Sequence, residues 1–274
     1  MTGSEIKKAL KAGKRVFGTC ITSPSPIWPA AIAGCGVDFV FIDNEHIPLD
    51  RSQDAWICQA FQALGIATVV RIPKVDAAAA CQMLDAGATG IVAPYMESPE
   101  EVQALRGSVR FHPLKGRRLQ EALASEDTLN DETRACLDKH NADKMLLVNV
   151  ESVPALERLD EILSVPGIDV ALAGPHDLSI NLGVPEQYAH PKFVEAMAHI
   201  IRTAEAHGVA PGFHFTPGKD TTGAWTRMGA RFVVHSTDIF MVQDTLRTAM
   251  SAYHAEFGQA GGGGQSGAPR TVVV

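Results

Sequence analysis

Short hydrophobic segments alternate with longer amphipathic segments along most of the chain. The short segments are rich in valine, isoleucine and phenylalanine and are apolar on both faces, which is typical of parallel strands covered by helices. We predict strands at residues 16–22, 38–45, 67–72, 90–95, 145–151, 169–174, 210–215 and 231–235.

The amphipathic segments between these strands have the periodicity and the end signals of helices. We predict helices at residues 4–12, 27–33, 51–64, 76–86, 131–140, 152–163, 193–204, 220–228 and 238–256, and a further one beginning at the Ser98–Glu101 capping box. Eight strands that alternate with helices indicate an α/β protein with a single-domain (β/α)₈ TIM barrel over residues 1–258. A doubly wound open sheet is the alternative, but no strand is followed by a GxGxxG turn.

Two segments do not follow this alternation. Residues 107–129 have no strong periodicity and contain several arginines, so we expect a long loop that is functional or part of an interface. Residues 259–274 are rich in glycine, cannot form a core and are expected to be a disordered tail.

The C-terminal ends of the strands build the site in a (β/α)₈ barrel. The polar residues at or just after these ends are Thr19, Asp43, Asn44, Glu45, His46, Arg71, Asn149, Glu151, Asp177, His214, Ser236 and Asp238. Glu151 and Asp177 follow successive strands, and two such carboxylates can converge on one divalent cation. Alternatively, Glu151 stabilises a helix N-terminus and Asp177 caps a turn.

His46 and Arg71 are the candidate proton-transfer and charge-stabilising groups. His46 lies three residues after Asp43, an arrangement that suits a general base oriented by a carboxylate. A loop histidine hydrogen-bonded at the barrel rim is the alternative. Arg71 on an apolar strand needs an anionic partner, which is Asp43, Glu45 or a substrate oxyanion. We expect His214 and His235, which lie on strands, only to support the residues that contact ligand.

The composition of the chain indicates which partners it binds and in which cellular compartment it is found. The net charge is −7 and the chain has no basic block, which argues against nucleic acid as a partner. The five cysteines are dispersed without CxxC spacing, as expected for reduced thiols in a cytoplasmic protein. There is no apolar signal region at the start and no apolar run of about 18 residues, so we expect no membrane association.

Several motifs together resemble one enzyme family over residues 4–256. They are Phe41–His46, Val69–Pro73, Leu84–Pro94, Val150–Glu151, Val165–Asp169 and Gly174–Ser179. The chain is similar to the HpcH/HpaI aldolases, the metal-dependent class II pyruvate aldolases. This resemblance implies reversible cleavage of a 4-hydroxy-2-oxo acid to pyruvate and an aldehyde through a metal-bound pyruvate enolate.

The resemblance also implies roles for individual residues. Glu151 and Asp177 would bind the divalent metal, which would be Mg²⁺, Mn²⁺ or Co²⁺. His46 with Asp43 would be the base system, and Arg71 would stabilise the carbonyl and the enolate. The implied substrate-binding residues are Arg71, Gly174, Pro175 and His176. The family also implies a homo-oligomer, with a homohexamer expected.

The chain departs from the family pattern at four places that leave the aldehyde partner open. These are Asn149, where many members have glutamine, the Arg117–Glu121 segment, the Phe213–Phe215 segment, and the His235–Asp238 segment. The predicted strands contain no lysine, which disfavours a Schiff-base mechanism. One rival function is a lyase of the citrate lyase β or malyl-CoA type. Another is a non-catalytic oxo-acid-binding barrel, against which the retained His46 and Arg71 argue.

Overall fold

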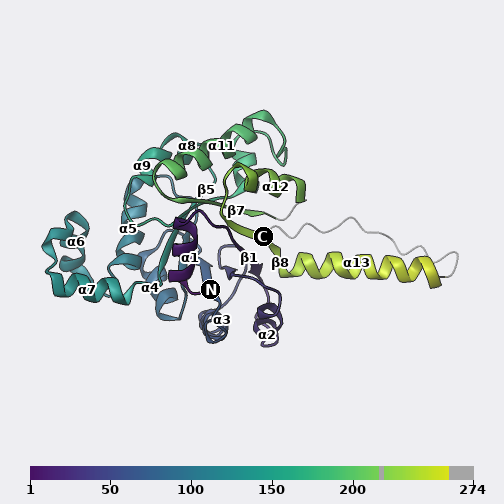
Figure 1. The fold of residues 1–274 in the computed structure, drawn as a ribbon, viewed down its shortest axis with the longest axis horizontal. Helices are drawn as coiled ribbons and strands as arrows, with labels where there is room; N and C mark the ends of the chain where they lie inside the picture. Colours follow the sequence, from purple (N-terminus) through teal and green to yellow (C-terminus); the bar gives the residue numbers. More distant parts are fainter. Residues whose placement is uncertain (216–218, 259–274) are drawn as a thin grey trace.

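Eight parallel strands close into one barrel in the computed structural model, which describes residues 1–215 and 219–258 (Figure 1). Each strand pairs with its neighbours in sequence, and β8 pairs with β1 to close the barrel. The strands are β1 (Val16–Ile21), β2 (Phe39–Asp43), β3 (Ala67–Arg71), β4 (Gly90–Ala93), β5 (Met145–Val150), β6 (Val170–Ala173), β7 (Ala210–Phe215) and β8 (Phe232–Thr237). This confirms the predicted (β/α)₈ barrel.

The helices confirm most of the predicted segments. They are α1 (Gly3–Lys11), α2 (Trp28–Ala33), α3 (Arg51–Ala63), α4 (Ala77–Asp85), α5 (Pro99–Arg110), α6 (Gly116–Ala124), α7 (Asp131–His140), α8 (Val153–Glu157), α9 (Leu159–Leu163), α10 (Pro175–Asn181), α11 (Pro191–Ala206), α12 (Lys219–Met228) and α13 (Asp238–Phe257). The predicted helix at 152–163 is two short helices that meet at Arg158, whose backbone leaves the helical conformation.

The prediction of a loop over residues 107–129 is wrong. Helix α5 continues to Arg110, and α6 and the 3₁₀ helix η1 (Glu126–Thr128) follow it. The apolar residues of this segment pack with α7 in a small separate core of Phe111, Ala122, Leu129 and Leu137. The periodicity is hard to see in the sequence because each helix is short and buries few residues.

Alternate side chains of each strand fill the barrel interior. The interior cluster includes Phe39 and Phe41 from β2, Val69 from β3 and Leu147 from β5. The next inward-facing positions on the same strands are polar, and they lie at the C-terminal ends. The apolar interior therefore ends in a polar layer that contains Asp43, Arg71, Asn149 and His214.

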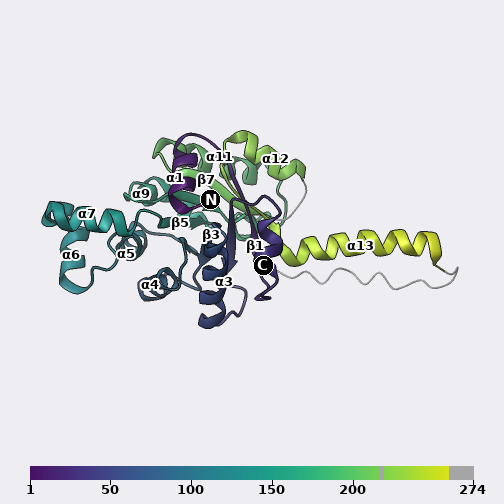
Figure 2. The same ribbon diagram turned by 60° about the horizontal axis from the view of Figure 1, so that its bottom comes forward.

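Helix α13 projects away from the barrel, on the side opposite α6 and α7 (Figure 2). It carries a series of exposed apolar side chains, Val242, Leu246, Met250, Tyr253 and Phe257. No helix in the described ranges is both long and apolar enough to cross a membrane. The predicted tail at residues 259–274 lies outside the described residues.

Candidate active site

Asp43 and Arg71 end neighbouring strands and are paired in register. Arg71 Nε donates to Asp43 Oδ1 at 2.9 Å, and Nη2 donates to Oδ2 at 2.5 Å. The side chain of Asp43 is fully buried and that of Arg71 is 7% exposed. Burial acts to raise the pKa of Asp43, but the hydrogen bonds and charge of Arg71 outweigh it and hold that pKa below its usual value. The anionic partner that Arg71 requires is therefore present within the protein.

Glu45 and His46 lie in the loop that follows β2. Glu45 Oε2 is 3.1 Å from Arg71 Nη1 and 3.9 Å from His46 Nε2. The oxygens of Asp43 are used by Arg71 and by the backbone N–H of Glu45, at 3.0 Å. His46 is thus linked to the Arg71–Asp43 pair through Glu45, a connection that the Asp43–His46 spacing alone does not indicate.

Glu151 follows β5 directly and is 2% exposed. Its Oε1 accepts the backbone N–H of Tyr95 at 2.9 Å, and its Oε2 accepts the amide of Asn149 at 2.8 Å. A side chain at Gly174 would place its Cβ 2.3 Å from Glu151 Oε2 and would force the carboxylate out of its present position. Ser152, and not Glu151, caps the N-terminus of α8.

Burial raises the pKa of Glu151 to about 7. The charges of Asp177 and Glu45 act in the same direction, whereas the N–H of Tyr95 and the charge of Arg71 oppose it. The carboxylates of Glu45 and Asp177 and the guanidinium of Arg71 therefore all act on the carboxylate of Glu151, and negative charge exceeds positive charge among these four groups. A bound cation would relieve this excess.

The residues at this position fit a divalent cation that takes few protein ligands. Among the described residues, no group of three or more His, Cys, Asp or Glu side chains is arranged to hold a metal ion. Mg²⁺ is usually bound through one or two carboxylates and keeps several waters, so a set of two acids such as Glu151 and Asp177 is compatible with it. Beside them, Asn149 Oδ1 is buried and has no hydrogen-bond partner among the described residues.

Asp177 and the predicted substrate-binding residues lie at the start of α10. Gly174 is the N-cap of this helix, Pro175 is its first residue and Asp177 is in its first turn, so Asp177 does not cap a turn. His176 Nδ1 lies 3.8 Å from Glu186 Oε1 in the following loop. The structure therefore places Gly174 against Glu151, and the charge of Asp177 acts on the same carboxylate, whereas His176 has a partner outside the acid pair.

His214 lies on β7 and faces the same polar layer as Arg71. Its ring is 5.1 Å from that of Phe41, and it has a backbone hydrogen bond to Ser236. Desolvation and the nearby charge of Arg71 lower the pKa of His214 to about 4, so its ring is neutral at physiological pH. His235 is exposed and points away from this layer, as its alternation with Ser236 requires.

Tyr95 is a site residue that the sequence pattern does not predict. It follows β4 and donates its backbone N–H to Glu151. Tyr95 has a φ of 47°, which a bulky residue rarely adopts. Its place at the end of the predicted strand 90–95 is the one sequence signal, because neither the positive φ nor the contact with Glu151 leaves a local pattern.

Comparison with known proteins identifies relatives that span nearly the whole chain. The family described as HpcH/HpaI aldolase/citrate lyase matches residues 19–244. A hydroxypyruvate/pyruvate aldolase of Sagittula stellata is 31% identical over 254 residues, which cover 93% of this chain and 98% of that protein. A 2-keto-3-deoxy-L-rhamnonate aldolase of Klebsiella pneumoniae is 29% identical over 262 residues, which cover 94% of this chain and 96% of that protein.

Solved structures agree with this assignment. An HpcH/HpaI aldolase from Desulfitobacterium hafniense has a TM-score of 0.79 and 28% identity, and the match covers 90% of this chain and 96% of that one. A citrate lyase β subunit from M. tuberculosis, described in complex with oxaloacetate and magnesium, has a TM-score of 0.52 and 17% identity. That match covers 83% of this chain and 93% of the subunit, and it shows a shared fold alone.

Proposed function

The chain belongs to the HpcH/HpaI aldolase/citrate lyase family, and we propose that it reversibly cleaves a 4-hydroxy-2-oxo acid to pyruvate and an aldehyde. It is a lyase, as its aldolase relatives are. One observation supports the proposal: Arg71, held by two hydrogen bonds to Asp43, shares the polar layer with Asn149, whose amide donates to the Glu151 carboxylate. The guanidinium would thus lie near the two acids that we propose to bind the cation.

Glu151 and Asp177 would hold the divalent cation, which we propose to be Mg²⁺, Mn²⁺ or Co²⁺. When bound, such a cation acts as a Lewis acid that polarises the keto oxygen of the substrate. Asn149 supports this role by donating to Glu151 Oε2, which fixes the orientation of the carboxylate. Gly174 and Pro175 would form the backbone of the substrate pocket beside it, and His176 would complete that side.

Arg71 would donate to the substrate oxygen on which negative charge develops. Asp43 holds the guanidinium in place from behind through two hydrogen bonds. A preorganised charge of this kind stabilises the enolate of pyruvate without reorganisation during the reaction.

His46 would remove the proton of the 4-hydroxyl group, directly or through one water. As that proton leaves, the hydroxyl becomes the aldehyde carbonyl and the C3–C4 bond breaks. Its electron pair remains on C3 as the enolate, which is then protonated to give pyruvate. Glu45 lies near both His46 and Arg71, so Asp43 would influence the base through the intervening Arg71 and Glu45.

A Schiff-base mechanism and a function of the citrate lyase β type have less support. The eight strands contain no lysine, and Lys144, which precedes β5, donates to the carbonyls of Leu84 and Ala88 at the opposite end of the barrel. This disfavours a Schiff base. The citrate lyase β subunit of M. tuberculosis shares only the fold, so no observation favours a coenzyme A thioester as substrate.

We also propose a homo-oligomer, most simply the homohexamer, in the cytoplasm. Residues 107–129 no longer support this proposal, because their apolar side chains pack into their own core. The exposed apolar side chains of α13 supply the support instead. The five cysteines are all free, as expected in a reducing compartment.

Two assays test the proposed reaction. The protein should release pyruvate from 4-hydroxy-2-oxo acids in a manner that EDTA abolishes and Mg²⁺, Mn²⁺ or Co²⁺ restores. It should also exchange the methyl protons of pyruvate with deuterated water, a reaction that needs the enolate but no aldehyde. Full cleavage activity after rigorous metal removal would contradict the proposal.

A further inference from the structure

Tyr95 connects the two candidate metal-binding residues. Its backbone N–H donates to Glu151 Oε1 at 2.9 Å. Its phenol oxygen accepts a hydrogen bond at 3.3 Å from the amide of Asn181, the last residue of α10. The same amide donates at 3.1 Å to the backbone carbonyl of Asp177. Tyr95 and Asn181 therefore link the carboxylate of Glu151 to the backbone of Asp177 through three hydrogen bonds.

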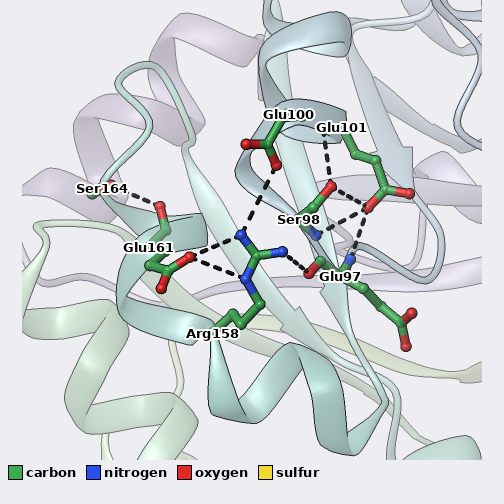
Figure 3. Close-up of polar contacts among 7 residues, drawn as sticks. All are labelled: Glu97, Ser98, Glu100, Glu101, Arg158, Glu161 and Ser164. Carbon is green, nitrogen blue, oxygen red and sulfur yellow. Dashed lines mark hydrogen bonds and ion pairs between the residues drawn. The ribbon is translucent and has the colours of Figure 1, made fainter.

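The loop that carries Tyr95 is held in place on its other side. The hydroxyl of Ser152 donates to the carboxylate of Glu97 at 2.5 Å, and Arg158 donates to the carbonyl of Glu97 at 3.4 Å. Figure 3 shows the Arg158 guanidinium between Glu161 and Glu97, while the Glu101 carboxylate accepts the backbone N–H groups of Glu97 and Ser98. These contacts fix the loop against α5 and α9.

The backbone of Tyr95 is strained, with a φ of 47°. Strained conformations of bulky residues persist only where the surrounding contacts impose them, and they are concentrated at functional sites. Here the strained residue is the one that points its N–H at Glu151 and its phenol at α10. The conformation therefore serves both contacts at once.

Helix α10 begins without a side-chain cap at its N-terminus. Its N-cap is Gly174, which has no side chain to bond the first turn. A larger residue there would displace the Glu151 carboxylate, whose Oε2 lies 2.3 Å from the Cβ position. The Tyr95–Asn181 hydrogen bond attaches the other end of the helix, its C-terminus, to the loop after β4.

We propose that Tyr95 is a positioning residue that fixes the placement of Asp177 relative to Glu151 and thereby sets the affinity for the divalent cation. This inference rests on the proposed role of these two acids. Residues that orient metal ligands typically contribute about 10- to 100-fold to metal affinity. The Tyr95 hydroxyl supplies one such contact, so we expect an effect near the lower end of that range.

The test is calorimetric titration of Mn²⁺ into the metal-free protein, without substrate. Tyr95→Phe keeps the ring and the backbone contact to Glu151 but loses the bond to Asn181, and Asn181→Ala removes the donor. Each should weaken Mn²⁺ binding by about tenfold. The double variant should bind no more weakly than Asn181→Ala, which also lacks the bond to the Asp177 carbonyl, because the Tyr95–Asn181 hydrogen bond is already absent in that single variant. The electron paramagnetic resonance spectrum of bound Mn²⁺ should change in the same variants.

Tyr253→Phe is the matched control, since Tyr253 is 63% exposed on α13 and far along the chain from the site. It should bind Mn²⁺ as the wild type does. Asn181 is exposed, so Asn181→Ala tests the proposal even if Tyr95→Phe fails to fold. Wild-type affinity in both single variants, or additive losses in the double variant, would overturn this inference alone. A wild-type protein that binds no Mn²⁺ would overturn the proposed metal site and this inference with it.

Discussion

Arg71 and Asp43 form a two-point ion pair that is buried between neighbouring strands. Burial acts to lower the pKa of the Arg71 guanidinium, but Asp43, Glu45 and Glu151 raise it above its ordinary value. The Arg71 guanidinium thus stays positively charged and fixed in place at the C-terminal end of the barrel. Stability and catalysis both depend on this arrangement, and they can be separated by experiment.

We expect Arg71→Ala to lower both the stability of the fold and the catalytic rate. It leaves the Asp43 carboxylate buried without a positively charged partner, which should cost about 3–5 kcal/mol of stability. Loss of a charge-stabilising donor should also lower the rate of pyruvate proton exchange by about 10²–10³ per folded molecule. Denaturant unfolding measures the first effect, and proton NMR in deuterated water measures the second.

The double variant Arg71→Met/Asp43→Leu separates the two effects. It replaces the buried pair by apolar side chains and should recover most of the stability without recovering proton exchange. Arg71→Lys keeps the charge but loses the planar two-point geometry, so it should regain only part of the rate. Proton exchange at the wild-type rate in Arg71→Ala would refute the catalytic role.

Metal-free protein should lose stability as the pH rises from about 5 to 7. Glu151 has a folded-state pKa of about 7, above the value near 4.5 expected for an unfolded chain. Between these two values the folded state holds a proton that the unfolded state has released, so each step up in pH favours unfolding. The total loss should be about 3 kcal/mol.

Mn²⁺ should oppose this loss because it binds the deprotonated carboxylate. The increase in melting temperature on adding Mn²⁺ should therefore grow between pH 5 and pH 8. Glu151→Gln should remove both the pH dependence of the metal-free protein and the shift caused by metal. Asp177→Asn should reduce the shift caused by metal. An unchanged shift in Glu151→Gln would argue that the cation binds elsewhere.

His46 should act on cleavage without affecting the metal site. His46→Ala should lower the rate of cleavage by about 10²–10⁴, the usual contribution of a general base. Its Mn²⁺ affinity should remain at the wild-type value, because His46 is not one of the proposed ligands. Steady-state kinetics with calorimetry provides both measurements, and His254→Ala on α13 is the control. Cleavage at the wild-type rate would leave His46 as a rim residue hydrogen-bonded in its loop.

The apolar face of α13 should be an interface between copies of the chain. Leu246 and Met250 lie one turn apart on this helix and are both exposed. Leu246→Glu/Met250→Glu should dissociate the oligomer, since it places charge on the face that would be buried. Sedimentation velocity at micromolar concentration measures the result, with Thr245→Glu as the control on the same helix. A wild-type protein that sediments as a monomer would contradict the proposal.

The sequence by itself determined the barrel, the order of its strands and the residues at their ends. Strand and helix periodicity are local properties, and the positions of Asp43, Arg71 and Glu151 at strand ends follow directly from them. The alternation of side chains also places Arg71 and His214 in the polar layer. These features need no knowledge of which residues meet across the fold.

Only the tertiary structure decided which partner each of these residues takes. It pairs Asp43 with Arg71, links His46 to that pair through Glu45, and joins Tyr95 to Glu151 across two strands. It also makes α6 a helix, because the apolar residues of that segment are buried only when α7 packs on them. Such contacts depend on distances between segments far apart in sequence, and no local pattern contains them.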